Sequence, residues 1–373
     1  MRYYIIAGER SGDLHAGNLV KAIAQKDPSS VFKGFGGDYM KGAGVQLTVH
    51  YRELAFMGFA EVVANLNKIS RNIKICKNDI LEFHPDVVIL VDYGGFNTRI
   101  AKFAKKKNIR VFYYITPKVW AWYQKRALTL KKNVDRMFVI LPFEKEFYKK
   151  FDWDVDYVGS PVLDAVRAHQ RDTLFVKKNN FDESKPVIAF LPGSRKQELA
   201  NVIPVMASVA LAFPDFQFGV AVVSNLDKTL YGALHDLQNV RFIEDDTYNL
   251  LLHSKAAIVT SGTATLETAL LRVPQAVIYK TSTISYTIAR SFIKVPFISL
   301  VNLIAGKQVV KEMIQSDMNA KAVISELKRL VLDENYRSRI AAEYQKIYQT
   351  LDIGSASENA AMLMLKYLKN QKE

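Results

Sequence analysis

The sequence predicts an α/β protein with two doubly wound parallel sheets. Short apolar runs alternate with segments of helical periodicity, and the alternation restarts after a polar, strand-poor stretch at residues 171–184. Alternation of this kind is typical of parallel strands joined by right-handed helical crossovers. The chain has 373 residues, which is enough for two domains that each bury a core. We therefore expect two such sheets that face a central cleft.

The first half of the chain predicts strands and helices in turn. The predicted strands are residues 3–7, 31–35, 86–91, 110–115 and 136–141, and the predicted helices are residues 14–25, 59–82 and 99–106. Each predicted strand is an almost wholly apolar run, which favours a strand buried on both faces of a parallel sheet.

The second half repeats this organisation. Its predicted strands are residues 187–191, 216–223, 240–243, 256–260 and 275–279, and helices follow over residues 320–369 with a break around Gly354. We expect three parts: an amino-terminal domain over residues 1–168, a second domain over residues 169–350, and a last helix over residues 351–373. The last helix is expected to pack back on an amino-terminal domain, of the same chain or of a partner.

The composition narrows the class of protein. A single cysteine, Cys76, excludes an intramolecular disulfide framework and a cysteine-cluster metal site, and it fits a reducing compartment. The six histidines show no metal-ligand spacing, so we expect no metal and no other cofactor. No signal-peptide pattern and no apolar run of spanning length is present, so we expect a cytoplasmic protein, or one that lies on a membrane from the cytosolic side.

Positive charge is concentrated in one stretch. The net charge is +14, and residues 101–150 alone hold 14 Lys and Arg against 3 Asp and Glu. A localised basic surface attracts anionic lipid headgroups, phosphorylated substrates or nucleic acid. The lysines at residues 102–107 also fit an ordinary solvated helix face.

Two glycine-containing turns in the second half are predicted to bind a diphosphate. Residues 191–195 (Leu-Pro-Gly-Ser-Arg) and 261–267 (Ser-Gly-Thr-Ala-Thr-Leu-Glu) each follow a predicted strand and open a helix. Free backbone N–H groups at a helix start bind anions, and a guanidinium meets phosphate oxygens in pairs. Glu267, within the second predicted helix, could accept hydrogen bonds from both hydroxyls of a ribose. The predicted binding residues are Gly193, Ser194, Arg195, Ser261, Gly262, Thr263 and Glu267.

Asp92 is the predicted general base. It ends a nearly all-apolar predicted strand, where a carboxylate is costly to desolvate unless it has a partner or a function. Burial raises the pKa of a carboxyl group toward the range that suits a base. The alternative is a structural carboxylate bonded to loop N–H groups.

Two other segments are predicted to contact a sugar or its phosphate. The turn that holds Ser11, Gly12 and Asp13 follows the first predicted strand, although Ser11 or Asp13 also suits a helix cap. Residues 113–126 mix tyrosines and tryptophans with basic residues, including Trp120, Lys125 and Arg126. Such a mixture suits sugar stacking, single-stranded nucleic acid or a membrane interface, and a packed interdomain loop is the plain alternative.

The segment at residues 54–73 is predicted to be a helix with more apolar side chains than one core face needs. With the basic flank of Lys68, Arg71 and Lys74, it suits a helix that lies in a bilayer interface, or otherwise a core helix. The predicted membrane-facing residues are Phe56, Met57, Phe59, Val62 and Val63.

Taken in order, these motifs resemble the lipid-A-disaccharide synthases, which are inverting glycosyltransferases of the GT-B type. The resemblance covers nearly the whole chain. The motifs that carry it are Ala7-Gly8-Glu9 with Ser11-Gly12-Asp13, Gly36-Gly37 with Met40, Met57-Gly58 with Glu61-Val62, Asp92 with Phe96-Asn97, Val119-Trp120-Ala121-Trp122 with Lys125-Arg126, Leu141-Pro142-Phe143-Glu144, Leu191-Pro192-Gly193-Ser194-Arg195 with Glu198, Ser261-Gly262-Thr263 with Glu267, and Asn302-Leu303 with Glu312 and Gln315.

The resemblance implies a GT-B fold and a defined reaction. UDP-2,3-diacylglucosamine and 2,3-diacylglucosamine 1-phosphate would give the β-1,6 disaccharide 1-phosphate of lipid A and UDP, without a metal. It also implies a peripheral enzyme on the inner face of the cytoplasmic membrane, with no nucleic-acid partner, as a monomer or a homodimer. By carry-over, Asp92 would be the base, Glu312 and Gln315 would join the UDP site, and Asn97 would lie near the sugar with Ser11 and Asp13.

The chain departs from the family pattern at two places. Gly95 stands where many members have a second acid, and Ser160 stands where members often have a histidine. The alternative function is another GT-B enzyme that acts on UDP-N-acetylglucosamine, either a glycosyltransferase or a 2-epimerase. A basic RNA- or membrane-binding module without catalysis is a further alternative, and it would need no diphosphate site.

Overall fold

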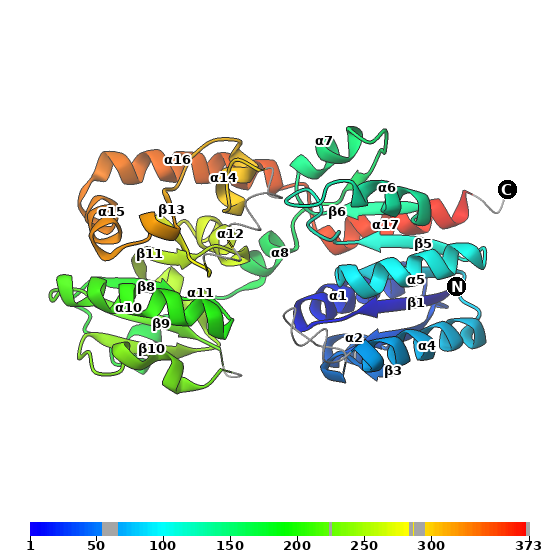
Figure 1. Cartoon of the computed structure of the whole chain (residues 1–373), viewed down its shortest axis with the longest axis horizontal. Helices are drawn as coiled ribbons and strands as arrows, with labels where there is room; N and C mark the ends of the chain where they lie inside the picture. Colours follow the sequence, from blue (N-terminus) through cyan, green and yellow to red (C-terminus); the bar gives the residue numbers. More distant parts are fainter. Residues whose placement is uncertain (54–65, 224–225, 283–285, 287–294, 371–373) are drawn as a thin grey trace. The chain divides into compact units, whose positions relative to one another are not determined.

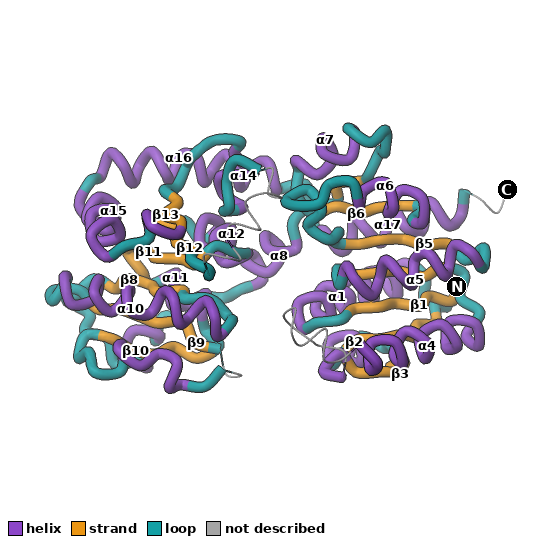
Figure 2. Tube along the Cα trace, viewed as in Figure 1, coloured by secondary structure: helices purple, strands orange, loops and turns teal. Residues whose placement is uncertain are grey.

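The computed structural model describes residues 1–53, 66–223, 226–282, 286 and 295–370 of the chain (Figure 1). The chain divides into two compact units. The first comprises residues 1–161 and 353–373, and the second comprises residues 162–352. Within each unit, strands lie side by side in one sheet and helices cover it (Figure 2).

The first unit contains a seven-stranded sheet in the order β3-β2-β1-β4-β5-β6-β7. Its strands are β1 (Arg2–Ala7), β2 (Val31–Gly36), β3 (Gln46–His50), β4 (Val87–Val91), β5 (Arg110–Tyr114), β6 (Arg136–Val139) and β7 (Asp156–Tyr157). All neighbouring strands are parallel. The strand order reverses between β1 and β4, which is where open α/β sheets bind their ligands.

The helices of the first unit pack on this sheet. They are α1 (Arg10–Lys26), α2 (Asp38–Gly42), α4 (Leu66–Phe83), α5 (Gly94–Lys106), α6 (Arg126–Asn133), α7 (Phe143–Lys149) and α17 (Ala356–Lys369). The last helix returns to the first unit, where Ala360, Met364 and Leu368 share a core with Leu19 of α1 and Ile5 of β1.

The second unit contains a six-stranded sheet in the order β10-β9-β8-β11-β12-β13, again all parallel. Its strands are β8 (Val187–Leu191), β9 (Gln217–Val222), β10 (Val240–Glu244), β11 (Ser254–Thr260), β12 (Gln275–Tyr279) and β13 (Glu312–Ile314). Its α-helices are α8 (Pro161–Ala168), α9 (Phe175–Lys178), α10 (Lys196–Ala212), α11 (Thr247–Leu252), α12 (Thr263–Leu270), α14 (Leu300–Ala305), α15 (Ala320–Leu332) and α16 (Glu334–Leu351).

The predicted fold class of two parallel α/β sheets is confirmed. Every predicted strand is present, whereas β3 and β13 were not predicted. Helix starts were predicted too late: α1 begins at Arg10 and α5 at Gly94, so Asp13 and Asn97 lie in helical turns and not in loops. The capping role suggested for Ser11 or Asp13 is wrong for α1, because Glu9 occupies its cap position.

Candidate active site

The carboxyl ends of β1 and β4 bring two acidic residues together. Ala7 and Val91 are register partners in these neighbouring strands, so Glu9 and Asp92 leave the sheet side by side. Packing does not require a carboxylate at each of two adjacent strand ends, so this pair indicates a catalytic or binding role.

The backbone of Asp92 is held in an uncommon conformation. Asp92 and Tyr93 both have φ 47°, in the left-handed region that non-glycine residues seldom adopt. Tyr113 Oη donates to the Asp92 carbonyl oxygen at 2.6 Å, and Asn97 Nδ2 donates to the same oxygen at 2.8 Å. The Asp92 N–H donates to the Ile115 carbonyl oxygen at 3.0 Å. These bonds fix where the Asp92 side chain leaves the strand.

Gly8 is needed because the Tyr93 ring occupies the space beside it. A Cβ on Gly8 would lie 2.1 Å from Tyr93 Cγ, closer than real Cβ atoms come to any neighbour. The Tyr93 ring also stacks on Phe96, with ring centroids 5.4 Å apart. The two turns that carry Glu9 and Asp92 are therefore packed against each other through a glycine.

The electrostatics of this pair suit a base. Burial, followed by the charge and hydrogen bond of Glu9, raises the pKa of Asp92 to about 7. The Lys118 ammonium and the Tyr93 N–H oppose this rise by stabilising the carboxylate. A carboxyl group with a pKa near 7 accepts a proton well at neutral pH.

A buried acid braces the loop that carries Lys118. Glu144 Oε1 accepts from Thr116 Oγ1 at 2.8 Å, and its Oε2 accepts from the Leu141 N–H at 3.0 Å. Burial raises the pKa of Glu144 to about 7. On the same loop Trp120 is only 5% exposed and packs edge-to-face on Phe143, so its ring is part of the packing.

Three other predicted sugar contacts, Asp13, Asn97 and Ser11, lie close after β1 or β4, and each has a hydrogen-bond partner within the chain. The Asp13 carboxylate is buried and accepts from the N–H groups of Gly37 at 2.7 Å, Tyr39 at 3.0 Å and Met40 at 3.1 Å. It thereby holds the turn that starts α2. Asn97 is also buried and uses its amide on the Asp92 turn. Ser11 Oγ donates to Glu9 Oε1 at 3.3 Å.

In the second unit, the first predicted diphosphate turn joins β8 to α10. Gly193 has φ +100°, and a Cβ there would lie 2.4 Å from Glu198 Oε2. That oxygen accepts the Ser194 N–H at 3.1 Å, and Glu198 Oε1 lies 3.3 Å from Arg195 Nη1. The chain thus places a carboxylate of its own at the start of α10, with the Arg195 guanidinium largely exposed beside it.

The second predicted turn joins β11 to α12. Ser261 Oγ donates to the Ile298 carbonyl oxygen at 2.8 Å, Gly262 is extended, and Thr263 begins the helix. Glu267 lies one turn further on, and burial raises its pKa. Tyr248 Oη donates to Glu267 Oε1 at 3.4 Å and partly offsets this rise.

Glu312 and Gln315 have partners within the second unit. The Glu312 carboxylate accepts from the N–H groups of Ile298 at 2.9 Å and Ser299 at 3.0 Å, and from Asn302 Nδ2 at 2.8 Å. Gln315 Oε1 accepts the Thr281 N–H at 2.8 Å. Both side chains hold loops at the carboxyl end of β12 and before α14.

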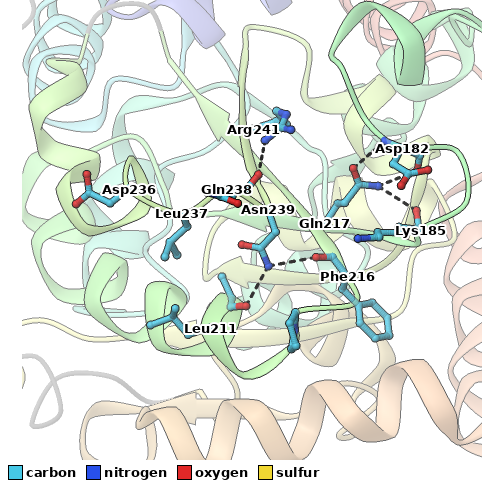
Figure 3. Close-up of a pocket in the computed structure, with 12 residues that line it drawn as sticks. Asp182, Lys185, Leu211, Phe216, Gln217, Asp236, Leu237, Gln238, Asn239 and Arg241 are labelled. Carbon is cyan, nitrogen blue, oxygen red and sulfur yellow. Dashed lines mark hydrogen bonds between the residues drawn. The ribbon is translucent and has the colours of Figure 1, made fainter.

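A pocket of about 490 Å³ lies away from these turns, where β9 and β10 begin (Figure 3). Gln217 Nε2 donates to the Asp182 carbonyl oxygen at 2.8 Å, and Asn239 Nδ2 donates to the Ala210 carbonyl oxygen at 3.1 Å. Both residues line the pocket, which lies at the amino-terminal ends of the strands. Gly193 and Ser261 follow the carboxyl ends of β8 and β11. The pocket is therefore separate from the candidate active site.

Some predictions fall outside the described residues. The five predicted membrane-facing residues are Phe56, Met57, Phe59, Val62 and Val63, and all lie within residues 54–65. In the part of the chain that the structure describes, no group of three or more His, Cys, Asp or Glu is arranged to hold a metal ion. Within the same residues, no helix combines the length and the apolar character that crossing a bilayer needs.

Several residues that contact the candidate site in the structure had no site role in the predictions from the sequence. They are Glu9, Lys118, Glu144, Glu198 and Tyr248. For Glu9 a signal was present, because it follows the β1 strand as Asp92 follows β4, and parallel strand ends meet at one edge. For Tyr248 there was no such signal, because its contact with Glu267 depends on the packing of α11 beside α12.

Two parallel α/β sheets with these strand orders define a protein of the GT-B fold class. The UDP-GlcNAc 2-epimerase of Neisseria meningitidis, solved with UDP-GlcNAc, aligns over 98% of this chain and 100% of its own, with TM-score 0.70 and 16% identity. A solved glycotransferase of kitacinnamycin aligns over 98% and 99%, with TM-score 0.65 and 12% identity. At these identities the likeness shows the fold alone.

The sequence comparisons identify the family within this class. The family model described as lipid-A-disaccharide synthetase matches residues 3–365. The lipid-A-disaccharide synthase of Syntrophus aciditrophicus is 40% identical over 98% of this chain and 97% of its own. That of Geobacter sulfurreducens is 36% identical over 99% and 98%. The chain belongs to the lipid-A-disaccharide synthetase family and is a glycosyltransferase, so the predicted family and enzyme class are confirmed.

Proposed function

We propose that the chain carries out the family's reaction with Asp92 as its base. A 2,3-diacylglucosamine unit passes from UDP to the 6-hydroxyl of 2,3-diacylglucosamine 1-phosphate, which gives lipid A disaccharide 1-phosphate and UDP. The observation that supports this role is the place of Asp92 at the carboxyl end of β4 beside Glu9, where burial and Glu9 raise its pKa to about 7. A base of this strength accepts the hydroxyl proton as the oxygen attacks.

In this reaction one bond forms and one breaks at the donor sugar. The acceptor 6-oxygen bonds to C1 of the donor while the bond from C1 to the UDP oxygen breaks, and attack from the opposite face inverts C1 to the β configuration. The hydroxyl proton passes to Asp92, and the electron pair leaves with UDP. Asn97 and Tyr113 act as positioning residues, because both bind the Asp92 carbonyl oxygen.

The second unit would hold the leaving UDP. Negative charge grows on the diphosphate as the bond breaks, and helix N-terminal N–H groups with a guanidinium stabilise such charge. The Glu198 carboxylate at the start of α10 supports this role, because it shows that the turn at Gly193 and Ser194 accepts an oxyanion. Glu267 would bind the ribose hydroxyls, and Glu312 and Gln315 would act by holding their loops. The proposed UDP contacts are Gly193, Ser194, Arg195, Ser261, Gly262, Thr263 and Glu267.

The first unit would bind the acceptor and face the membrane. Lys125 and Arg126 would meet the acceptor phosphate, and Lys118 offers a further cation beside Asp92. Of the sugar contacts predicted from the sequence, Ser11 and Gly12 lie in the first turn of α1, directly after β1, whereas the buried Trp120 ring packs on Phe143. Because both substrates carry acyl chains, we place the enzyme on the inner face of the cytoplasmic membrane as a peripheral protein.

The test is a product assay. Purified protein is mixed with both lipid substrates in detergent micelles that contain EDTA, and UDP release and the disaccharide mass are followed together. Equal amounts of UDP and disaccharide are expected. Folded, UDP-binding protein that yields no disaccharide but interconverts UDP-N-acetylglucosamine with its 2-epimer would replace this proposal with the epimerase.

A further inference from the structure

Three large apolar side chains are exposed on and before helix α6. Trp122 is 52% exposed, Tyr123 is 56% exposed and Leu128 is 54% exposed. The other two tryptophans of the chain, Trp120 and Trp153, are 5% and 9% exposed. Side chains of this size are seldom turned to water together within a few residues without a partner.

The local structure holds these side chains outward. α6 buries Ala127, Leu130 and Asn133, and the helical spacing of three and four places Lys125, Leu128 and Lys132 together on its exposed side. The preceding loop is fixed by the Arg126 N–H, which donates to the Tyr123 carbonyl oxygen at 3.0 Å. Gln124 Nε2 donates to the Trp120 carbonyl oxygen at 3.0 Å.

The stretch of sequence that holds these side chains carries charge of one sign. Residues 101–134 hold ten Lys and Arg and no Asp or Glu. The first acid beyond them, Asp135, is engaged by Lys105 and by the Val111 N–H. An exposed group of Trp, Tyr, Leu and Lys without acids matches an anionic bilayer surface, where aromatic rings sit at headgroup level and lysines meet phosphates.

We infer that Trp122, Tyr123, Lys125, Leu128 and Lys132 form an anchor on anionic phospholipid, which we call the α6 anchor. The inference rests on the proposed function, because the loop before α6 that holds Trp122 also carries Lys118 beside Asp92. Contact of this loop with the bilayer brings the base to the surface in which the acceptor lipid lies. Leu128 favours a lipid over a nucleic acid, since an aliphatic side chain adds nothing to base stacking.

The first experiment uses the tryptophan itself. Because Trp120 and Trp153 are buried, bilayer contact changes the fluorescence of Trp122. On vesicles of phosphatidylcholine with phosphatidylglycerol whose acyl chains carry bromine, the emission of the wild type is expected to fall, and the emission of Trp122→Phe to stay unchanged. Equal quenching of the two proteins, or no quenching of bound wild type, would overturn the inference.

The second experiment measures vesicle binding by flotation. Leu128→Ser with Lys132→Glu is expected to lower binding about tenfold on vesicles with phosphatidylglycerol, because the pair removes insertion and reverses a charge. The matched control is Leu332→Ser with Lys328→Glu on α15, where Leu332 is 74% exposed and Lys328 is four residues away. Equal binding by the two double variants, or binding to RNA and not to vesicles, would refute the anchor.

Turnover in detergent micelles separates this inference from the proposed function. The Leu128→Ser, Lys132→Glu variant is expected to keep wild-type turnover there, with unchanged thermal melting, and to lose it on vesicles. If the wild type turns over and the anchor substitutions do not change vesicle binding, the proposed reaction is supported and the α6 anchor is refuted. If the anchor substitutions lower vesicle binding but no protein turns over, the α6 anchor is supported and the proposed reaction is refuted.

Discussion

Glu9 and Asp92 lie at the carboxyl ends of the neighbouring strands β1 and β4, where the protonated Asp92 carboxyl group donates to the Glu9 carboxylate and two acids share one site. Glu9 follows β1 and Asp92 follows β4, so the acidic partner of Asp92 comes from the neighbouring strand. A like charge beside a half-buried carboxyl group disfavours its ionisation, which is how Glu9 and burial together bring the Asp92 pKa to about 7. The pH dependence of the enzyme is thereby tied to a residue 83 positions earlier in the chain.

Glu9→Gln is expected to move the acid limb of kcat/KM to lower pH. The base works when ionised, so wild-type activity at one pH unit below a pKa of about 7 is about tenfold under its plateau. Removing the Glu9 charge lowers the Asp92 pKa, so the variant keeps more activity on the acid side. Lys118→Met is the opposing control, because loss of the cation raises the pKa. The measurement is kcat/KM against pH, and a shift in the same direction for both variants would contradict the pairing.

Asp92→Asn is expected to stabilise the fold at neutral and alkaline pH. The folded-state pKa is about 7 and the unfolded value is about 4, so folding favours the protonated form and stability falls as pH rises from 4 to 7. At about 1.4 kcal/mol per pKa unit, the gain above pH 7 is at most about 4 kcal/mol. It should vanish below about pH 4. Thermal melting at pH 8 and pH 4 measures this, and a variant less stable than wild type at pH 8 would speak against the raised pKa.

Gly193→Ala is expected to weaken UDP binding at least about tenfold. Its φ of +100° disfavours a side chain, and the new Cβ would strike Glu198 Oε2 at 2.4 Å, so the turn must move. Gly42→Ala is the matched control, because no atom lies within 4 Å of a Cβ there. Calorimetric titration with UDP checks both variants. Unchanged affinity in a folded Gly193→Ala protein would remove this turn from the UDP site.

Tyr248→Phe is expected to make UDP binding more sensitive to acid. The Tyr248 hydroxyl donates to Glu267 and holds its pKa down, so its loss lets burial raise that pKa further. Protonated Glu267 loses an acceptor for the ribose hydroxyls, so the UDP affinity of the variant falls on the acid side and meets wild type at alkaline pH. A UDP analogue without ribose hydroxyls is the control ligand and should show no such difference. A loss of UDP affinity that is equal at all pH values would mean that Tyr248 acts only in packing.

The sheets could be predicted from the sequence because their strands are long, apolar and buried on both faces. β12 matches its prediction at both ends, and β8 does as well. The missed strands are short or exposed: β13 has three residues and includes Glu312, and β3 contains no buried residue. Such strands form because a neighbouring strand offers free backbone groups, and a single segment carries no sign of that neighbour.

The sequence predicts which residues follow the strands at the site, but it does not predict the hydrogen bonds between separate loops. Asp92 and the turn at Gly193 follow apolar strands, which a sequence shows directly. The hydrogen bonds of Asp13 to the turn at residues 37–40 and of Glu144 to Thr116 join segments that only the folded sheet brings together. Asp13 was predicted to cap a helix or to contact a sugar, and Glu144 was given no role, because sequence spacing says nothing of contacts between separate loops.

The most direct measurement is turnover by Asp92→Asn above pH 7, with both lipid substrates in micelles. If Asp92 is the base, the rate falls about 100-fold to 10,000-fold while UDP affinity and folding are retained. Asn cannot accept the proton but fills the same space, so the loss would report chemistry and not packing. Turnover within a few-fold of wild type, from a variant that binds UDP normally, would contradict the assignment of the base to Asp92.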